Sequence, residues 1–569
     1  MLLWISLPAC QDGGLIALEP LSTPPPSSPP PSSPPAETPF SSLVPTDTPT
    51  ALPELSPTRT PELTPTLPVV STDTPRSFPT QAPSPSATEG PSVTLSPLPT
   101  LLPSTPTLPP LPTPQLTLVP ELSPDPTEFP EPSSPSLLLP ERAGYHLVVI
   151  HTDTLRRDHM PMYGYPRNTF PLLSRRPWVV VEEVRASSSW TAPSSASFFS
   201  GLDLFEHQVT YFVPELNGPG TANQPLASPT FMGHLQAAGY RTALFSGSGF
   251  VQPETGYGAG LDFFYGQGKD NGVSNAGQLL AQATQWWSVQ GGSVPRSIFV
   301  QPMDAHDPHS PAAEDLGTWS DPEHLPIDLS ADLNTQALQL ELAYAAADEA
   351  GKAEITVQMN ALYDEQLLGL DRSIEQFLTW LEANGWLSRT VVVITSDHGE
   401  TLNNTGDGTF NHGRTVREEL IRVPLLMLVP ETLAQQQACL MSNMDTLPTV
   451  LEMLQVPEMP DIRGKARQQE CANVMVSSNF DLSGALYFAN ADDEAHRLTW
   501  NCLSGEVSSY DLVKDPAGLE DLGFDGAMEM PPTLWTELQQ YVDAATQTET
   551  SLRCLAPMAR PLPGKIQHP

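Results

Sequence analysis

The sequence has no long hydrophobic run, few cysteines and few basic residues, and each shortage excludes a class of protein. A membrane-spanning helix needs about 18 or more consecutive apolar residues, and no such run occurs. The five cysteines form no Cys-x-x-Cys pair, which argues against a thiolate zinc site. Only 26 Lys and Arg residues stand against 65 Asp and Glu residues, for a net charge of −39. Such a chain repels phosphate backbones at long range, so we expect no nucleic acid partner.

Proline divides the chain into two unequal parts. Of the 66 prolines, 38 lie in the first 140 residues. Residues 20–142 are a Pro/Ser/Thr-rich tract that cannot bury a core, and we predict a disordered, extended linker there. A ligand tract for proline-binding modules is the alternative. The rest is long enough for a large core, and we divide it into a catalytic domain at 143–465 and a C-terminal subdomain with its tail at 466–569.

Residues 1–19 suggest a targeting segment. The start is short and apolar, and Leu7, Ala9 and Cys10 are similar to a bacterial lipoprotein cleavage box, although Pro8 is atypical. We interpret it as the end of a signal segment whose true start lies upstream. A lipidated Cys10 would then tether an exported protein to a membrane, in the cell envelope or outside the cell. An apolar N-terminus without a targeting role is the alternative.

The other cysteines all lie in the last third of the chain, at Cys439, Cys471, Cys502 and Cys554. An even number in an exported chain predicts one or two disulfides, and four cysteines allow three full connectivities. The sequence does not choose among them, and it does not indicate an oligomeric state.

Short apolar runs with helical patterns between them predict the fold. Residues 145–153, 296–306 and 390–397 are β-branched runs of the kind found in strands buried on both faces of a parallel sheet. From Asp364 an apolar stripe at helical spacing runs to Asn384-Gly385, where the helix should end. The alternation predicts a three-layer α/β/α sandwich with a mostly parallel central sheet and a smaller C-terminal subdomain.

Polar residues stand where three predicted strands end. Asp153, Asp397 and His306 lie at or just past the carboxyl ends of these strands, where open α/β sheets form their ligand crevice. Asp397 and the adjacent His398 offer an oxygen and a nitrogen to a divalent cation. Alone, an Asp-His pair is more often an ordinary loop feature, but Asp153 supplies a further carboxylate in the same layer.

Thr191 precedes Pro193 and an apolar pattern, so it should lie at the start of a helix. One interpretation is a helix N-cap. The other is a nucleophile, because coordination to a dication lowers the pKa of a hydroxyl by many units.

Together these segments resemble the sulfatase branch of the alkaline phosphatase superfamily. The resemblance covers about residues 143–545 and is carried by the segments 148–171, 190–202, 303–311, 391–400, 410–427 and 504–522. It implies an alkaline phosphatase-like fold and one metal ion held by Asp153, Asp397 and His398, with Thr191 as fourth ligand and nucleophile.

The same resemblance assigns the groups around the substrate. It implies that His306 and His412 contact the transferred group or protonate the leaving oxygen, and that Arg414 clamps the anion. Without it, each histidine would be assigned a structural role. A second metal would need further ligands, and the nearby Asp304 and His309 do not have the usual Asp-x-x-x-His spacing. We therefore expect one metal.

The sequence departs from the formylglycine-dependent sulfatases at three places. Those enzymes share a Cys/Ser-x-Pro-x-Arg segment, which here runs from Thr191 to Ser195 and lacks both the oxidisable residue and the arginine. Thr154 and His398 replace a second Asp and an Asn. With fewer carboxylates and one imidazole, Mn²⁺ or Zn²⁺ fits better than Ca²⁺, which remains the alternative. The pattern is similar to the phosphoester and phosphonate hydrolases, and to the phosphoethanolamine and glycerol-phosphate transferases, which use a metal-bound Thr.

Three functions follow from these observations. The first is a metal-dependent hydrolase that cleaves phosphate or phosphonate esters, phosphodiesters included, through Thr191. The second is a sulfuric ester hydrolase that works without formylglycine, and the third is a catalytically inactive surface protein with the same fold. The substrate would be an ester of a small molecule, a lipid headgroup or a glycan, selected by loops such as 203–230 and 310–345.

Overall fold

The computed structural model describes residues 137, 139–209, 225–266, 275–413, 415–480, 486–501, 504–527 and 529–547. The predicted targeting segment at 1–19 and all but the end of the predicted linker at 20–142 lie outside these residues. Arg414, Cys502 and Cys554 lie outside them as well.

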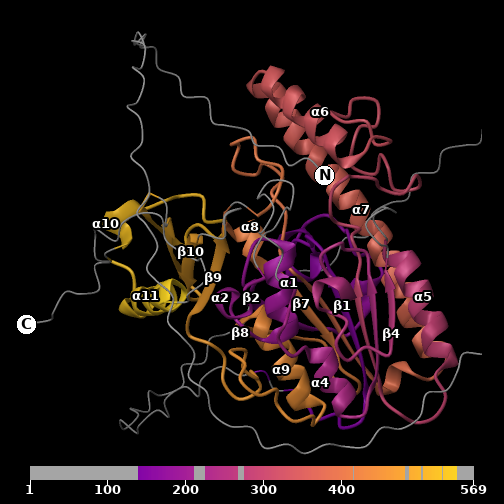
Figure 1. Ribbon diagram of the computed structural model, residues 1–569. Coiled ribbons are helices and arrows are strands. Elements are labelled where there is room, and N and C mark those ends of the chain that lie inside the picture. The colour runs from indigo at the N-terminus through magenta and orange to yellow at the C-terminus, as the bar shows by residue number, and fades with distance from the viewer. Residues whose placement is uncertain are drawn as a thin grey trace, which may run out of the picture. The chain divides into compact units, whose positions relative to one another are not determined.

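A large mixed sheet forms the centre of the predicted catalytic domain, residues 143–465 (Figure 1). Its eight strands run in the order β4-β3-β5-β1-β6-β7-β2-β8. Neighbouring strands are parallel except that β7 is antiparallel to both β6 and β2. The strands are β1 (His146–Thr152), β2 (Val179–Arg185), β3 (Arg241–Ser246), β4 (Phe263–Gly266), β5 (Arg296–Gln301), β6 (Thr390–Ser396), β7 (Arg422–Leu428) and β8 (Gln435–Ser442).

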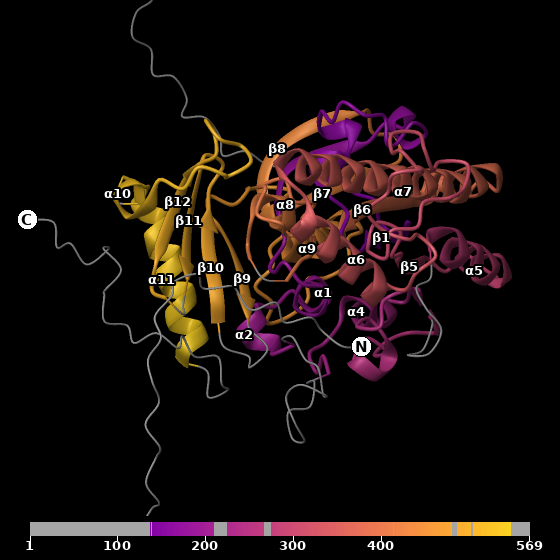
Figure 2. The same ribbon diagram turned by 90° about the horizontal axis from the view of Figure 1, so that it is seen from above.

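Helices cover both faces of this sheet (Figures 1 and 2). Successive side chains of a strand point to opposite faces, so on β1 Val149 packs into one core cluster and Ile150 into the other. The first cluster includes side chains of α1 (Thr191–Ser200), α4 (Phe231–Ala237) and α9 (Asn443–Met453). The second includes side chains of α5 (Ala276–Val289) and α7 (Glu349–Ala383). The predicted α/β/α sandwich is therefore confirmed.

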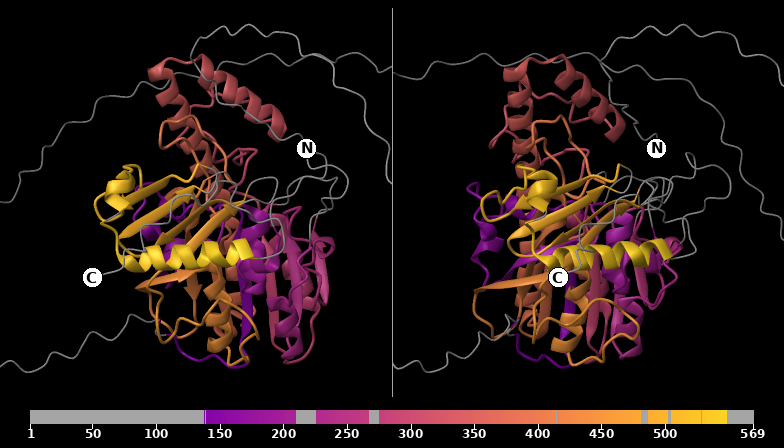
Figure 3. Two further views of the ribbon diagram at one scale, coloured as in Figure 1. Left: turned by 60° about the vertical axis from the view of Figure 1, so that its left-hand side comes forward. Right: turned by 90° about the vertical axis from the view of Figure 1, so that its left-hand side faces the viewer.

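Two helical regions extend further than the sequence indicated. Helix α7 ends at Ala383, before Asn384 and Gly385 as predicted, but it begins at Glu349 rather than near Asp364. The interval 310–345, taken as a loop, contains most of helix α6 (Leu333–Ala346). Helix α6 and the first turns of α7 extend beyond the sheet (Figure 3). None of the described helices, α7 included, is long and apolar enough to cross a membrane.

A second sheet follows the catalytic domain. Its four strands run in the order β12-β11-β10-β9 and pair antiparallel. Helix α11 packs against this sheet through Leu534, Trp535 and Leu538 (Figures 2 and 3). The elements are β9 (Met475–Phe480), β10 (Leu486–Asp492), β11 (His496–Asn501), β12 (Val507–Asp511), α10 (Gly523–Ala527) and α11 (Pro532–Gln547). The short remaining elements are α2 (Leu204–His207), α8 (Glu418–Ile421) and the 3-10 turns Arg157–His159, Pro161–Tyr163, Leu173–Arg175, Pro253–Thr255 and Leu387–Arg389.

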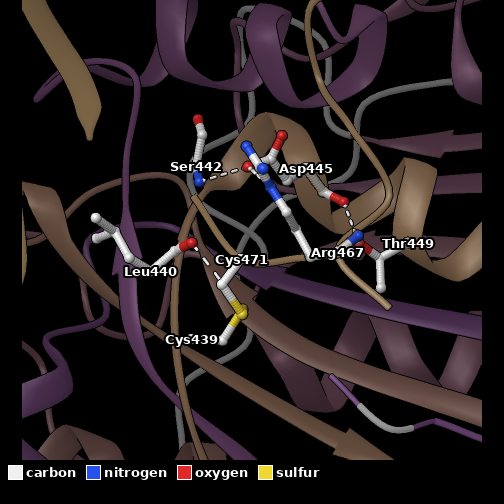
Figure 4. The surroundings of a disulfide bond; sticks show 7 residues. All are labelled: Cys439, Leu440, Ser442, Asp445, Thr449, Arg467 and Cys471. Carbon is white, nitrogen blue, oxygen red and sulfur yellow. Dashed lines mark hydrogen bonds and ion pairs between the residues drawn. A yellow bond between two sulfur atoms is a disulfide. The ribbon is translucent and has the colours of Figure 1, made fainter. Parts of the chain in front are cut away.

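A disulfide joins β8 to the segment that leads into β9 (Figure 4). Cys439 pairs with Cys471, with 5.3 Å between the Cα atoms. The same segment is held along α9, where the Asp445 carboxylate accepts a hydrogen bond from Arg467 Nε at 2.9 Å. One of the cysteine pairings that the sequence left open is thus assigned.

Candidate active site

The ends of β1 and β6 bring two carboxylates together. Thr152 and Ser396 are the last paired residues of these parallel strands, so Asp153 and Asp397 follow them side by side. His398 comes next, and ligand atoms of Asp153, Asp397 and His398 all lie within 4.8 Å of one another. All three side chains are fully buried.

The hydrogen bonds of this cluster leave ligand atoms free. Asp397 Oδ1 accepts hydrogen bonds from the backbone N–H groups of Thr154 at 3.2 Å and His398 at 2.8 Å. Asp397 Oδ2 and Asp153 Oδ1 are buried without a hydrogen-bond partner. His398 Nδ1 donates to the Gly399 carbonyl at 2.8 Å, so Nε2 keeps its lone pair. Buried carboxylate oxygens without a hydrogen-bond partner, beside an imidazole nitrogen that keeps its lone pair, are the donor set that a divalent cation requires.

The electrostatics of the cluster agree with that assignment. Burial and the neighbouring Asp397 raise the pKa of Asp153 above its ordinary value. Burial lowers the pKa of His398 to about 4, so its imidazole is neutral at physiological pH. Two buried carboxylates within 4.8 Å of each other are costly unless a cation compensates their charge. The donor set of these three residues therefore fits a divalent metal.

Thr191 is the first residue of α1, and its hydroxyl faces this cluster. Thr191 Oγ1 lies 3.4 Å from Asp153 Oδ2 and 3.2 Å from His398 Nε2. The N-cap position belongs to Trp190, whose side chain makes no capping hydrogen bond. The interpretation of Thr191 as an N-cap was therefore wrong. The structure brings all four of the expected metal-ligating residues together.

A chain of polar side chains ties α1 to the second carboxylate strand. Ser194 Oγ donates to the Asp397 carbonyl at 2.6 Å. Asn443, at the start of α9, donates to Ser194 Oγ at 2.9 Å and accepts from the Ser187 N–H at 3.1 Å. This chain fixes α1 relative to the cluster of Asp153, Asp397 and His398.

His412 lies beside the cluster, and the sequence did not reveal what holds it. Its ring centroid is 4.6 Å from that of His398 and 5.0 Å from that of His306. His412 Nδ1 lies 2.9 Å from Glu400 Oε2, and the Glu400 side chain is 2% exposed. Burial alone would lower the pKa of His412, but the Glu400 carboxylate raises it above its ordinary value. Glu400 is therefore a site residue that sequence reasoning missed, although it lies only two positions after His398.

His306 reaches the same place from the loop after β5. Its Nδ1 atom lies 2.7 Å from the Asp307 carboxylate. Burial opposes protonation, but Asp307 and Asp153 raise the pKa of His306 well above its ordinary value. Trp190 closes the other side of this group, with its ring centroid 5.1 Å from that of His412.

The residues weighed for a second metal are engaged elsewhere. Asp304 Oδ2 accepts a hydrogen bond from the Ala276 N–H at 2.7 Å, and His309 Nδ1 lies 2.7 Å from Gln366 Oε1. In the part of the chain that the structure describes, the cluster of metal-ligating side chains is Asp153, Asp397 and His398. The expected anion clamp, Arg414, lies outside the described residues.

Known proteins share this fold and parts of this sequence. Two curated relatives from Bacteroides thetaiotaomicron align over parts of the chain. An N-acetylglucosamine-6-O-sulfatase is 28% identical over 147 residues, which are 25% of this chain and 26% of that protein. An endo-4-O-sulfatase is 28% identical over 152 residues, 26% of this chain and 28% of that protein. The aligned region thus spans little more than a quarter of either relative.

Solved structures match over a much larger part of the chain. A protein in complex with its substrate D-glucosamine-2-N,6-O-disulfate has a TM-score of 0.56 at 16% identity, covering 73% of this chain and 99% of that chain. The phosphonate monoester hydrolase of Agrobacterium radiobacter has a TM-score of 0.54 at 16% identity, covering 71% and 96%. At such identity these structures establish the fold.

The Sulfatase family model matches residues 145–456, more than half of the 569-residue chain. That interval contains the paired strand ends, helix α1 with Thr191, and the three histidines of the candidate site. The chain therefore belongs to the Sulfatase family and has the alkaline phosphatase-like fold of ester hydrolases.

Proposed function

We propose that the protein hydrolyses phosphate or phosphonate esters, phosphodiesters included, through Thr191. The observation that carries this proposal is the position of Thr191 Oγ1, 3.2 Å from His398 Nε2 and 3.4 Å from Asp153 Oδ2. A hydroxyl held within a buried carboxylate and imidazole cluster is placed to lose its proton and act as a nucleophile. Thr191 cannot be oxidised to the formylglycine aldehyde, so its hydroxyl itself must attack.

Asp153, Thr191, Asp397 and His398 would hold one divalent cation, which supplies a lowered hydroxyl pKa and compensates negative charge on the transferred group. Mn²⁺ and Zn²⁺ suit two carboxylates, a hydroxyl and one imidazole, and Ca²⁺ is the alternative. The Thr191 oxygen, already deprotonated, attacks phosphorus in line, the bond to the leaving oxygen breaks, and a covalent ester of Thr191 with the phosphoryl or phosphonyl group forms. The same deprotonated oxygen is released when water attacks, so Thr191 neither gains nor loses a proton within the cycle.

His412 and His306 act on the leaving oxygen and on the equatorial oxygens of the transferred group. Because Glu400 lies against Nδ1 of His412, the Nε2 atom of that ring faces away from Glu400 and can donate a proton to the leaving oxygen. Water then attacks phosphorus, Thr191 leaves, and His412 regains its proton from that water. Arg414 follows His412 by two residues, and we keep the anion-clamping role proposed for it.

Hydrolysis of sulfate esters is the second candidate. Both curated relatives are sulfatases, and a sulfate ester carries the same oxygen geometry as a phosphate ester. The same groups would act on it without formylglycine. The two candidates differ in which central atom Thr191 attacks.

Parallel assays of the full chain separate these candidates. The panel comprises 4-nitrophenyl phosphate, bis(4-nitrophenyl) phosphate, 4-nitrophenyl phenylphosphonate and 4-nitrophenyl sulfate, each with Mn²⁺, Zn²⁺ or Ca²⁺. We expect metal-dependent turnover of the phosphorus esters that falls by roughly 10⁴-fold or more in Thr191→Ala, while Thr191→Ser keeps part of it. Full metal-dependent turnover in Thr191→Ala would rule out the proposed nucleophile, and turnover of the sulfate alone would favour the second candidate.

We also propose that the protein is exported and tethered through Cys10, and that its substrates are esters of small molecules, lipid headgroups or glycans. The Cys439–Cys471 pairing supports an oxidising compartment. Membrane fractionation of the wild type and of Cys10→Ala tests the tether. An unchanged membrane fraction in Cys10→Ala would contradict it.

A further inference from the structure

The C-terminal sheet touches the segment that leads to the nucleophile. Strand β9 donates a hydrogen bond from the Ser478 N–H to the Ser187 carbonyl at 2.9 Å. Its Ser477 hydroxyl donates to the Ala186 carbonyl at 2.6 Å. Both acceptors lie between the end of β2 and Thr191. Figure 2 shows β9 as the strand of this sheet that faces the catalytic domain.

The next residue of β9 touches the segment that carries His412. Asn479 is 2% exposed, and its Nδ2 atom donates to the Gly413 carbonyl at 2.5 Å. Gly413 directly follows His412 and has a positive φ of 83°. A Cβ atom there would lie 2.5 Å from Cε3 of Trp190. The backbone at Gly413 is therefore confined between the Trp190 ring and the Asn479 amide.

A buried ionic network fixes the same segment further along. Arg497 of β11 donates to Asp492 at 2.7 Å and forms an ion pair with Glu418 of α8. Arg185, at the end of β2, lies 3.9 Å from the same Glu418 carboxylate. The side chains of all four residues are almost fully buried. The C-terminal sheet thus contacts the chain both before Thr191 and after His412.

We propose that Asn479 is a positioning residue for the reaction, through which the C-terminal sheet sets the place of His412 relative to Thr191. This inference rests on the proposed function, in which His412 protonates the leaving oxygen. The contact through which Asn479 acts is with the main chain next to His412. Its amide holds the Gly413 carbonyl, and because a single peptide separates Gly413 from His412, a shift of that carbonyl displaces the imidazole.

The test compares Asn479→Ala with Ser509→Ala in the full chain. Ser509 is a buried residue of β12 whose hydroxyl donates to the Gly523 carbonyl at 2.9 Å, within the same sheet but away from the site. Each variant therefore removes a side-chain hydrogen bond made by the C-terminal sheet. We expect kcat for esters with poor leaving groups to fall about 10-fold or more in Asn479→Ala, with KM and metal affinity unchanged. Ser509→Ala should keep the wild-type kcat.

The dependence on the leaving group separates positioning from general destabilisation. Esters of 2,4-dinitrophenol need no proton from His412, so their turnover by Asn479→Ala should stay within a factor of about three of the wild type. Gly413→Ala forces a methyl group toward Trp190 and so displaces the Gly413 backbone on the side away from Asn479. It should also lower turnover of esters with poor leaving groups and leave turnover of 2,4-dinitrophenyl esters nearly unchanged. If Asn479→Ala does not fold, Asn479→Ser is judged by the same criterion.

These measurements distinguish failure of the proposed function from failure of the positioning role of Asn479. A wild-type protein that turns over no ester with any metal would contradict the proposed function itself. An active wild type whose Asn479 variant is folded and equally active toward poor leaving groups, or loses equal activity toward both kinds of ester, would overturn the positioning role alone.

Discussion

The Glu400 carboxylate lies 2.9 Å from Nδ1 of His412, and both side chains are almost fully buried. Arg156 Nη1 donates to the Glu400 carbonyl at 3.0 Å, which holds that residue from the opposite side. The carboxylate therefore fixes the tautomer and direction of the imidazole, since Nδ1–H faces Glu400 and Nε2 points away from it, as the proposed proton donation requires.

Replacing Glu400 should therefore impair proton donation rather than nucleophilic attack. In Glu400→Ala we expect kcat/KM for alkyl esters to fall about 100-fold, because general acid catalysis typically contributes at least this much. Esters of 2,4-dinitrophenol should be nearly unaffected, and Glu400→Gln should give an intermediate loss for alkyl esters. The measurement is kcat/KM against leaving-group pKa, and an equal loss for every ester would contradict the pairing.

Replacing Asp397 or His398, the two residues that follow β6, should weaken metal binding. Asp397→Asn and His398→Ala each remove one donor atom from the cluster, so titration calorimetry of Mn²⁺ or Zn²⁺ into the chelator-treated protein should show at least about a 10-fold weaker affinity. In the wild type, metal at 100 times its Kd should stabilise the fold by about 2.7 kcal/mol. His309→Ala, outside the cluster, is the matched control and should bind metal as the wild type does. Equal affinity in all three variants would refute the assigned ligands.

The Cys439–Cys471 disulfide closes a loop between residues 32 positions apart. A loop of this length constrains the unfolded chain enough to contribute about 3–4 kcal/mol of stability. The double variant Cys439→Ser/Cys471→Ser should therefore lose about that much in urea unfolding under oxidising conditions. Under reducing conditions its stability should approach that of the wild type. Equal stability under oxidising conditions would show that the bond is not formed in solution.

His207 should make the protein sensitive to acid. It is buried at the end of α2, where Nδ1 accepts the Val209 N–H at 3.0 Å and Nε2 lies 3.0 Å from Ser197 Oγ. Burial lowers the pKa of His207 to about 3, below the ordinary 6.5. Between these values the unfolded chain binds a proton that the folded chain does not, so stability falls by about 1.4 kcal/mol for each pH unit below 6.5.

Urea unfolding between pH 7 and pH 4 measures this contribution. In His207→Gln the slope of unfolding free energy against pH should be shallower than in the wild type by about 1.4 kcal/mol for each pH unit. Parallel slopes for the two proteins would mean that His207 is protonated in the folded state.

The strands of the site could be predicted because each is buried on both faces. Residues 145–153 and 390–397 are largely apolar runs, and parallel strands end at the same edge of a sheet, so Asp153 and Asp397 could be placed at one edge. Their direct approach follows from the pairing of β1 with β6, which required the structure. The start of α7 could not be placed in this way. Its first turns extend beyond the sheet and carry no apolar stripe, although Asp348 caps the helix by accepting the Gly351 N–H at 2.9 Å.

Glu400 and the C-terminal contacts depend on tertiary folding, which leaves no periodic signal. Glu400 meets His412 only because the intervening loop folds back on itself, with the Asn403 N–H donating to the Thr409 carbonyl at 2.9 Å. The contact of Asn479 with Gly413 joins residues 66 positions apart. Neither pairing follows from spacing, and both required the structure.

The close main-chain contact of Gly399 with residues 419–420 limits how the segment that carries His398 can move. Its N–H donates to the Leu420 carbonyl at 2.7 Å, and a Cβ atom at this position would lie 1.9 Å from the Glu419 carbonyl oxygen. The segment that carries His398 is thus in direct main-chain contact with the segment that follows His412. This contact resists separation of the two segments, so we expect a bulkier substrate to be accommodated by the surrounding loops rather than by movement of His398 away from His412.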